Sequence, residues 1–424
     1  MRVLIVNKSS RTGGAAVAAS RLMDALINNG VKAKMLVADK DADNINVVET
    51  GIAWSKRWAF LWERLCIFLR LHLSRKRLFE VDIANSGLDI TNTREFEEAD
   101  IIHLHWINQG MLSLKGIEKI LKSGKPVVWT MHDAWPSVGI CHLTANCDNY
   151  TRECGLCRLL PGGGSKKDLS YKIWKKKKDL LEAYPIHFVA CSRWLADKAL
   201  HSGLLQEQNV TAIPNTLDRR VFMRRNKMEA KDMLGLPAGK KVILFAAQKV
   251  TNRYKGMSYL VSAINKLAAD DSVRNSYVVA LLGGGTDELA RQMNIDVMPL
   301  GYISDEKKIV EAYNAADVFV LPSLEDNLPN TIMEAMACGT PCVGFDVGGI
   351  PEMIDHKKNG YVARYKDPDD LAEGIQWVVG HERYDSLSDA AVAKVAADYS
   401  QSLVAKRYID VYNDALKNTN YYDI

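Results

Sequence analysis

Residues 321–353 hold the densest group of side chains that could bind a ligand, in the order LPSLEDNLPNTIMEAMACGTPCVGFDVGGIPEM. Asp326 lies in an acidic loop, and Glu334 follows in a helix that we expect to begin near Asn330. Backbone amides at such a helix start favour a phosphate, while the Glu334 carboxylate can accept hydrogen bonds from a ribose diol. The amides expected to face the phosphate are those around Leu328, Asn330 and Thr331. A plain N-capping loop would explain one such carboxylate but not the whole group.

A cationic loop precedes this segment in the sequence AAQKVTNRYKGMSYL. Its cations are Lys249, Arg253 and Lys255, followed by Gly256. Lysine acts on a phosphate as a point charge and arginine as a fork, so the loop could neutralise a diphosphate. A generic basic loop is the alternative, and the neighbouring acidic loop favours the ligand interpretation.

Two further stretches of the first half could face a ligand. Gly13 and Gly14 lie between an apolar run and a helix of small residues, where backbone amides can approach an anion. A tight turn without a ligand is the alternative. His132 closes the run PVVWTMHD and is a candidate catalytic residue, whereas His103 and His105 in HLHW are expected to be strand-end histidines with satisfied hydrogen bonds.

The eight cysteines include a cluster of four, Cys141, Cys147, Cys154 and Cys157, in the pattern C-x5-C-x6-C-x2-C. Thiolates at such short spacing suit tetrahedral zinc, so we expect a structural metal site, with His142 as a substitute ligand. Disulfide or redox pairing and unliganded thiols are the alternatives. The other four cysteines are expected to be buried as small apolar side chains.

The elements that must position these residues are short apolar runs alternating with helical stretches, the pattern of parallel strands in an α/β fold. The expected strands are 3–6, 33–38, 100–106, 126–133 and 187–192 in the first half, and 241–248, 276–285, 296–301, 317–323 and 341–346 in the second. We therefore predict two doubly wound, Rossmann-like domains, 1–217 and 218–400, facing across a cleft. The last helix, within 401–424, is expected to return to the first domain.

The chain has 424 residues and a net charge of +4, which argues against a nucleic-acid binder. No run is long and apolar enough for a transmembrane helix, and the first residues do not resemble a signal peptide, so we expect a cytoplasmic protein. Residues 54–79 nevertheless combine tryptophans at spacing four with several arginines, and 166–180 are rich in lysine. Such a helix could lie on an anionic membrane, or it could be a core helix with a solvated basic side.

The ordered motifs resemble those of a known family. KG (255–256), LGYIS (300–304), ADVFVLPS (316–323), EDNLPNTIMEAMACGTP (325–341) and GG (348–349) are similar to the retaining, nucleotide-sugar-dependent glycosyltransferases of family 4, which have the GT-B fold. The glycine pair near the N-terminus, TMHD and IPN (213–215) match in the same order. The cysteine cluster resembles an insertion in bacterial exopolysaccharide and colanic-acid-type transferases.

The resemblance implies a role for each matching residue. Lys255 would bind the donor diphosphate with Lys249, Glu334 would hold the ribose, and the backbone near Gly301 would frame the base. Asp326 occupies the first acidic position of the family's E-x7-E motif, so the pattern here is D-x7-E. As a catalytic residue beside His132 it would contact the hydroxyls of the donor sugar, a role in which Glu325 could substitute. His132 would position the donor and stabilise charge rather than act as a nucleophile.

The activity implied is a hexosyltransferase reaction from a UDP- or GDP-sugar to a growing bacterial polysaccharide, with a glycan or lipid-linked acceptor. No catalytic metal is expected, and the membrane contact would be peripheral, at the inner face. Two alternatives remain open at this stage. A nucleotide-sugar epimerase would keep the fold with other chemistry, and a catalytically silent GT-B scaffold would bind partners only.

Overall fold

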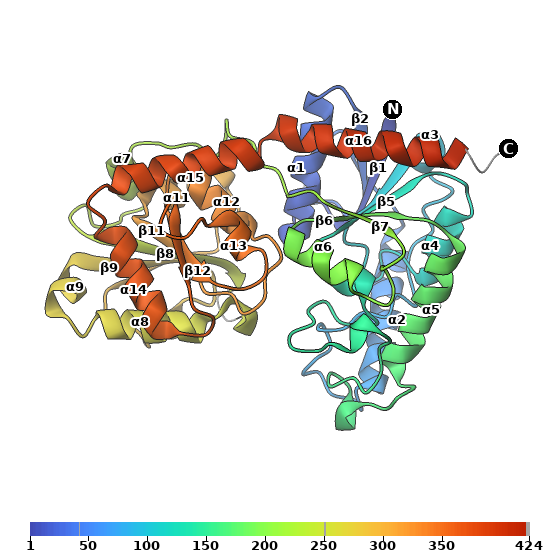
Figure 1. Cartoon of the computed structure of the whole chain (residues 1–424), viewed down its shortest axis with the longest axis horizontal. Helices are drawn as coiled ribbons and strands as arrows, with labels where there is room; N and C mark the ends of the chain where they lie inside the picture. Colours follow the sequence, from blue (N-terminus) through green and yellow to red (C-terminus); the bar gives the residue numbers. More distant parts are fainter. Residues whose placement is uncertain (42, 250–251, 421–424) are drawn as a thin grey trace. The chain divides into compact units, whose positions relative to one another are not determined.

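The apolar runs form two parallel sheets in the computed structural model, which describes residues 1–41, 43–249 and 252–420. The chain divides into unit 1, made of 1–216 and 401–424, and unit 2, made of 217–400. Each unit has a sheet covered by helices on both faces (Figure 1). Both are Rossmann-like α/β units, so the predicted fold class is confirmed.

The sheet of unit 1 has the strand order β3-β2-β1-β4-β5-β6-β7. Its strands are β1 (Arg2–Ser9), β2 (Lys32–Asp39), β3 (Val47–Glu49), β4 (Ile101–Leu104), β5 (Val127–Met131), β6 (His187–Ala190) and β7 (Asn209–Ala212). Its α-helices are α1 (Gly14–Asn28), α2 (Ala53–Arg70), α3 (Arg94–Glu98), α4 (Leu114–Leu121), α5 (Leu169–Ala183), α6 (Arg193–Leu200) and α16 (Gln401–Asn420). The order reverses between β1 and β4, where ligands of doubly wound folds bind.

The sheet of unit 2 has the order β10-β9-β8-β11-β12-β13. Its strands are β8 (Lys241–Lys249), β9 (Tyr277–Gly284), β10 (Val297–Gly301), β11 (Val318–Leu321), β12 (Cys342–Phe345) and β13 (Gly360–Ala363). Its α-helices are α7 (Lys227–Met233), α8 (Met257–Leu267), α9 (Asp271–Ser276), α10 (Asp287–Ala290), α11 (Glu306–Ala315), α12 (Asn330–Ala337), α13 (Ile350–Met353), α14 (Pro368–Val379) and α15 (Tyr384–Asp398). Here the order reverses between β8 and β11.

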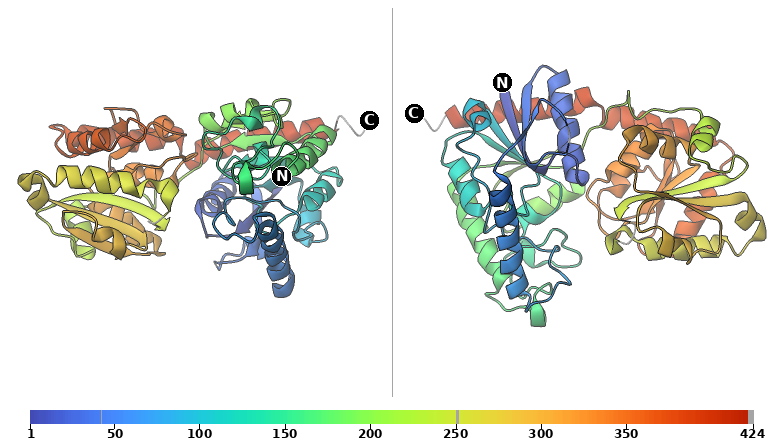
Figure 2. Two further views of the ribbon diagram at one scale, coloured as in Figure 1. Left: turned by 90° about the horizontal axis from the view of Figure 1, so that it is seen from below. Right: turned by 180° about the vertical axis from the view of Figure 1, so that it is seen from behind.

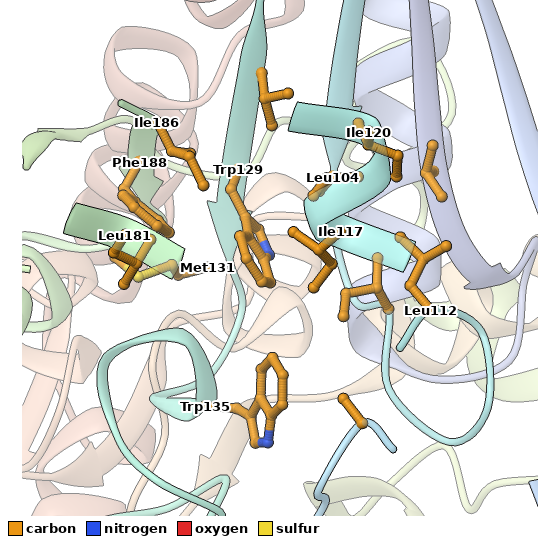
Figure 3. Packing of buried hydrophobic residues seen from close by; sticks show 14 of the residues in the cluster. Leu104, Leu112, Ile117, Ile120, Trp129, Met131, Trp135, Leu181, Ile186 and Phe188 are labelled. Carbon is orange, nitrogen blue, oxygen red and sulfur yellow. The ribbon is translucent and has the colours of Figure 1, made fainter. Parts of the chain in front are cut away.

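Both faces of the unit 1 sheet are buried, which explains why its strands are continuously apolar rather than alternating. On β5, Trp129 and Met131 point to one face and Val128 to the other. Figure 3 shows Trp129 between Phe188 on one side and Leu104 on the other. The opposite face is covered by α1 and α16. The buried side chains of α16 in this cluster are Val404, Ala405, Tyr408, Val411 and Tyr412.

Candidate active site

In unit 2 the predicted cationic and acidic loops leave β8 and β11, the two strands between which the order reverses. The Lys255 Nζ lies 2.5 Å from Asp326 Oδ2. The Ser323 hydroxyl donates to the same carboxylate oxygen at 3.0 Å. The structure therefore brings Lys255 and Asp326 together at the carboxyl ends of adjacent strands, where a ligand of this fold binds.

Close backbone contacts hold Lys255 and Asp326 in place, one between Gly256 and the loop after β11 and one between Asp326 and the loop after β12. Gly256 has φ 69°, and a Cβ atom built on it would lie 1.7 Å from the carbonyl oxygen of Pro322. Gly348 has φ 63°, and its Cβ would lie 1.8 Å from the carbonyl oxygen of Asp326. Only glycine fits at both positions, because the conformation is left-handed and the space is occupied. Lys255 and Asp326 are consequently held on rigid backbone.

The helix expected near Asn330 begins at that residue, as α12, after Pro329 at the N-cap. Leu328 is buried, and Asn330 and Thr331 form the first turn, so their placement suits the expected phosphate amides. Glu334 is buried in α12, where its Oε2 accepts a hydrogen bond from the Tyr313 hydroxyl at 2.8 Å. Tyr313, a partner that the sequence did not suggest, thus orients this carboxylate.

Two other expected donor contacts lie at strand ends of unit 2. Gly301 closes β10 with φ 69°, and the space around its would-be Cβ is open. Lys249 ends β8 opposite Gly284, but its side chain lies outside the described residues. Glu325, the proposed substitute for Asp326, is buried beside it.

In unit 1, His132 follows β5 directly and stacks on His105, which follows β4. His105 Nδ1 lies 2.9 Å from His132 Nε2, and the Cys191 sulfur lies 3.6 Å from His132 Nδ1. Burial lowers the pKa of His132 to about 4. This imidazole is therefore neutral at physiological pH, able to accept or share a hydrogen bond but not to carry positive charge.

Both ring nitrogens of His103 have hydrogen-bond partners, as expected for a strand-end histidine. Its Nε2 lies 2.8 Å from the Thr130 hydroxyl and its Nδ1 2.7 Å from the Tyr412 hydroxyl on α16. Burial lowers its pKa to about 3. For His105 the expectation holds only in part, because its Nε2 is buried without a hydrogen-bond partner among the described residues.

Gly13 and Gly14 follow β1, the strand next to β4 in the sheet of unit 1. Gly13 has φ 94° at the N-cap of α1, and Gly14 is the first residue of that helix. The Asn7 side chain accepts from the Trp106 amide at 2.9 Å and so ties the end of β1 to the end of β4. The glycine turn and the histidine pair thus flank the point where the strand order of unit 1 reverses.

Asp133, the residue after His132, belongs to a network of hydrogen bonds that the sequence did not predict. His142 bridges two carboxylates, with Nδ1 2.8 Å from Asp133 and Nε2 2.5 Å from Asp82. Although burial opposes the charge, Asp133 and Asp82 raise the pKa of His142 to about 10. Arg64 of α2 completes the network by pairing with Asp82. The sequence hinted at this network only through the adjacent His132 and Asp133 of TMHD, because Asp82 lies far from them in the chain.

The expectation that His142 could replace a cysteine as zinc ligand is wrong, because both its ring nitrogens are bound by carboxylates. Burial is the largest cause of the raised pKa of Cys141, and the nearby thiols of Cys154, Cys157 and Cys147 raise it further. The four clustered thiols therefore lie near one another. The Cys154 sulfur accepts a hydrogen bond from the Gly139 amide at 3.2 Å. Within the described ranges, however, no three ligand side chains are placed to hold a metal ion.

None of the eight cysteines, all of which the structure describes, forms a disulfide. Cys191, Cys338 and Cys342 are buried as expected, while Cys66 is half-buried.

The lysine-rich stretch 166–180 is less uniformly basic at the surface than its sequence suggests. Lys177 of α5 turns inward and donates to the carbonyl oxygens of Trp135 and Val138, at 2.6 and 2.9 Å.

Residues 12–221 match the family described as Glycosyltransferase Family 4, and residues 240–381 match the family described as Glycosyl transferases group 1. These two segments are glycosyltransferase domains. The resemblance to family 4 glycosyltransferases that the motifs indicated is thus confirmed at the level of these domains. The first match includes the residues of the cysteine cluster, but it shows neither a cysteine-rich insertion nor a colanic-acid-type specificity.

Curated relatives of these domains are glycosyltransferases. The chain is 27% identical over 369 residues to an uncharacterized glycosyltransferase of Methanocaldococcus jannaschii, covering 80% of this chain and 90% of that protein. It is 24% identical to the N-acetyl-alpha-D-glucosaminyl L-malate synthase of Bacillus anthracis, covering 51% of this chain but only 57% of that enzyme. It is 31% identical to an N,N'-diacetylbacillosaminyl-diphospho-undecaprenol alpha-1,3-N-acetylgalactosaminyltransferase of Campylobacter jejuni, covering 32% of this chain and 38% of that enzyme.

Solved structures share the fold of these glycosyltransferase domains. A glycosyltransferase from Rickettsia africae superposes with a TM-score of 0.66 and 15% identity, covering 98% of this chain and 99% of that one. Anabaena HepE, solved in complex with UDP and glucose, gives a TM-score of 0.65 at 16% identity, covering 98% and 100%. The fold of the chain is therefore GT-B.

Proposed function

We propose that the chain transfers a sugar from a nucleotide-sugar donor to an acceptor hydroxyl. The observation that carries this proposal is the ion pair between Lys255 and Asp326, held on glycine-fixed loops at the strand-order reversal of unit 2. It lies in the segment that matches Glycosyl transferases group 1. The similar Anabaena protein was solved in complex with UDP and glucose, which supports a UDP-sugar; a GDP-sugar is the second donor class.

The donor would be held by residues of unit 2. Lys255 and the Lys249 position neutralise the diphosphate, and the amides around Leu328, Asn330 and Thr331 face it at the start of α12. Glu334, oriented by Tyr313, accepts hydrogen bonds from the ribose hydroxyls, while the backbone at Gly301 borders the base. Asp326 has a shorter side chain than the family's glutamate, and here it orients Lys255.

The reaction would retain the anomeric configuration. The bond between the anomeric carbon and the diphosphate oxygen breaks, the acceptor oxygen bonds to the same face, and the acceptor proton passes to the leaving phosphate. His132, neutral and held by His105, positions the sugar and stabilises developing charge through hydrogen bonding. Gly13 and Gly14 offer backbone amides to the same region of unit 1. No step in this scheme needs a metal ion.

The acceptor class proposed is a glycan on a lipid carrier, in polysaccharide biosynthesis at the inner face of the membrane. Its support is the name of the Campylobacter jejuni relative, whose acceptor is linked to undecaprenol. Such an acceptor stays in the bilayer, so the enzyme must work close to a lipid surface. No nucleic-acid partner is proposed.

We also propose that the four clustered thiols hold a structural zinc ion. The support is the tetrad of Cys141, Cys147, Cys154 and Cys157 with its terminal CxxC, the donor set that zinc prefers. The loop would have to close further than in the structure, where no metal-binding group is formed among the described residues. Metal analysis after purification without chelator tests this, and a zinc stoichiometry near zero with titratable thiols contradicts it.

The test of the transfer proposal is a thermal-shift screen of UDP- and GDP-sugars followed by turnover assays. A donor that binds the native state raises its stability by mass action. Lys255→Ala should weaken donor binding about tenfold to a hundredfold, because a hydrogen bond to a charged group contributes about 1.5 to 3 kcal/mol. Lys266→Ala, on the exposed side of α8, is the matched control and should bind the donor as the wild type does.

The two alternative functions predict different results. An epimerase would rearrange the donor sugar without acceptor, and no sugar would appear on the acceptor. A silent scaffold would bind no donor, or would gain activity only in Asp326→Glu. Absence of both donor binding and turnover across the panel contradicts the transfer proposal.

A further inference from the structure

Helix α2 carries a contiguous stripe of large apolar side chains that face solvent. The stripe comprises Trp54, Trp58, Leu61, Trp62, Leu65 and Leu69, all exposed. Their spacing of three and four places them on one helix face. The tryptophans are 69%, 60% and 41% exposed, and the rings of Trp58 and Trp62 stack at 5.8 Å. Contiguous exposed apolar surface of this kind marks an interaction site, whereas single exposed residues do not.

The opposite face of α2 fixes the helix so that the stripe cannot turn inward. Glu63 is buried, and its Oε1 accepts from the amides of Ile83 and Ala84 at 3.0 and 2.7 Å. Arg64 is buried as well, pairs with Asp82 and donates to the Leu78 carbonyl at 2.7 Å. α2 lies at the periphery of unit 1 (labelled in Figure 1), and in Figure 2 it is the lighter of the two blue helices. The stripe is thus a fixed feature of the fold, which rules out the interpretation of α2 as a core helix with only a basic outer side.

Cations surround the stripe and exposed carboxylates are absent from the helix. Arg57 and Arg70 are exposed on α2, and Arg75 and Lys76 are exposed just after it. Glu63, the one carboxylate in the sequence of α2, is buried. The outer face therefore presents apolar side chains together with positive charge, the composition of helices that lie in a bilayer interface.

A cation-lined pocket of about 420 Å³ lies at the C-terminal end of the same helix. Its cations are Arg70 at the end of α2 and Lys167 and Lys172, which lie before and within α5. The single carboxylate in the lining, Asp168, is engaged by the amides of Ser170 and Cys157 at 2.8 and 2.9 Å. The pocket therefore suits a phosphate group, adjacent to a surface that suits acyl chains.

We propose that the outer face of α2 docks on an anionic phospholipid bilayer, with a lipid phosphate in the pocket of Arg70, Lys167 and Lys172. Tryptophan favours the boundary between headgroups and acyl chains, and each nearby basic residue is attracted by anionic lipid. No helix in the described ranges is long and apolar enough to cross a bilayer, so the contact is interfacial. The inference rests on the proposed function, since a lipid-linked acceptor requires this proximity, and it names the surface that provides it.

Co-sedimentation of the full chain with vesicles tests the proposal. We expect binding to vesicles of phosphatidylcholine with phosphatidylglycerol, weak binding to phosphatidylcholine alone, and loss of binding at high salt. The double variant R75E/K76E should lower partitioning by at least about thirtyfold, because each basic residue contributes about 1 kcal/mol. W54S/W58S should lower it at least about tenfold. Ile45→Ser, which changes a 91% exposed apolar residue outside α2, should leave it unchanged.

Three results would overturn the proposal: pelleting that does not depend on phosphatidylglycerol, W54S/W58S binding like the wild type, or a dimer in light scattering that W54S/W58S dissociates. The last result would assign the stripe to a second copy of the chain. Donor-induced thermal shift without vesicles separates this inference from the proposed function. Lost vesicle binding with an intact donor shift contradicts only the docking surface, whereas vesicle binding without any donor shift contradicts only the transfer function.

Discussion

Individual residues of the candidate site were recognisable in the sequence, but their pairings were not. Lys255 and Asp326 could each be named from local motifs, yet their 2.5 Å contact depends on β8 and β11 being neighbours in the sheet. Glu334 could likewise be named from its motif, whereas its partner Tyr313, on a different helix, could not. Residue types and local spacing predict chemistry, whereas the partner of a buried charge is decided by topology.

The His142 network predicts a pH dependence of stability. The native pKa of His142 is about 10, above the ordinary value of 6.5, because Asp133 and Asp82 outweigh the effect of burial. A raised pKa gives stability that is complete below pH 6.5 and is lost as the pH rises towards 10. The free energy of unfolding should therefore fall by up to about 1.4 kcal/mol per pH unit in that range.

Denaturant unfolding of the wild type and of His142→Gln between pH 7 and 9 measures this contribution. The variant should be less stable at pH 7, because Asp133 loses its charged partner and Asp82 keeps only Arg64, and its stability should fall less steeply with pH. His201→Gln, at the exposed end of α6, should keep the wild-type slope. Equal slopes for His142→Gln and the wild type would show that His142 is not protonated in the native state.

Whole strands were predicted where the sequence holds a sufficiently long apolar run. All ten expected strands are present, and nine of them are central strands of their sheets, buried by helices on both faces. Among the described residues, the strands that were missed are β3, β7 and β13, and each is outermost in its sheet. Their sequences, VVE, NVTA and GYVA, are only three or four residues long, so they lack the run by which even the edge strand β10 was recognised.

The contact between the loops after β8 and β11 predicts the effect of a single methyl group. Gly256→Ala places a Cβ 1.7 Å from the Pro322 carbonyl oxygen at a φ of 69°. Gly235→Ala imposes a similar φ, 65°, with no atom within 4 Å of the added Cβ. Gly235→Ala should therefore cost only the strain of the left-handed conformation, about 1 to 2 kcal/mol.

Gly256→Ala should cost more than this control and should also weaken the donor-induced thermal shift, because the displaced loop carries Lys255. Thermal unfolding with and without the donor measures both effects. Equal destabilisation by the two substitutions, with an unchanged donor shift, would mean that the close contact with Pro322 does not position Lys255.

At the scale of the molecule, the chain leaves unit 1 near Thr216 and re-enters it as α16 from Gln401. Unit 1 therefore depends on residues that follow unit 2 in the chain. The long amphipathic pattern of α16 and its return to the first domain were expected from the sequence, but its partners there were not, since the contact of Tyr412 with His103 joins residues far apart in the chain. The charge of +4 also gave no sign of the basic surface on α2, because net charge averages over both units.

Removing residues 401–424 should unfold unit 1 and leave unit 2 folded. The deletion exposes the faces covered by Val404, Tyr408, Val411 and Tyr412 and leaves His103 without its Tyr412 partner. Each buried side chain of this size contributes about 1.5 to 3 kcal/mol, so the four together match the whole stability of a typical domain, about 5 to 15 kcal/mol. Hydrogen exchange on the truncated chain should show lost protection in β4 and β5 and retained protection in β8 and β11. Tyr412→Phe, which keeps the packing and removes only the hydrogen bond to His103, should retain protection in both units. If unit 1 remains protected after the deletion, its core does not require α16, and the packing of α16 on β5 contributes little to its stability.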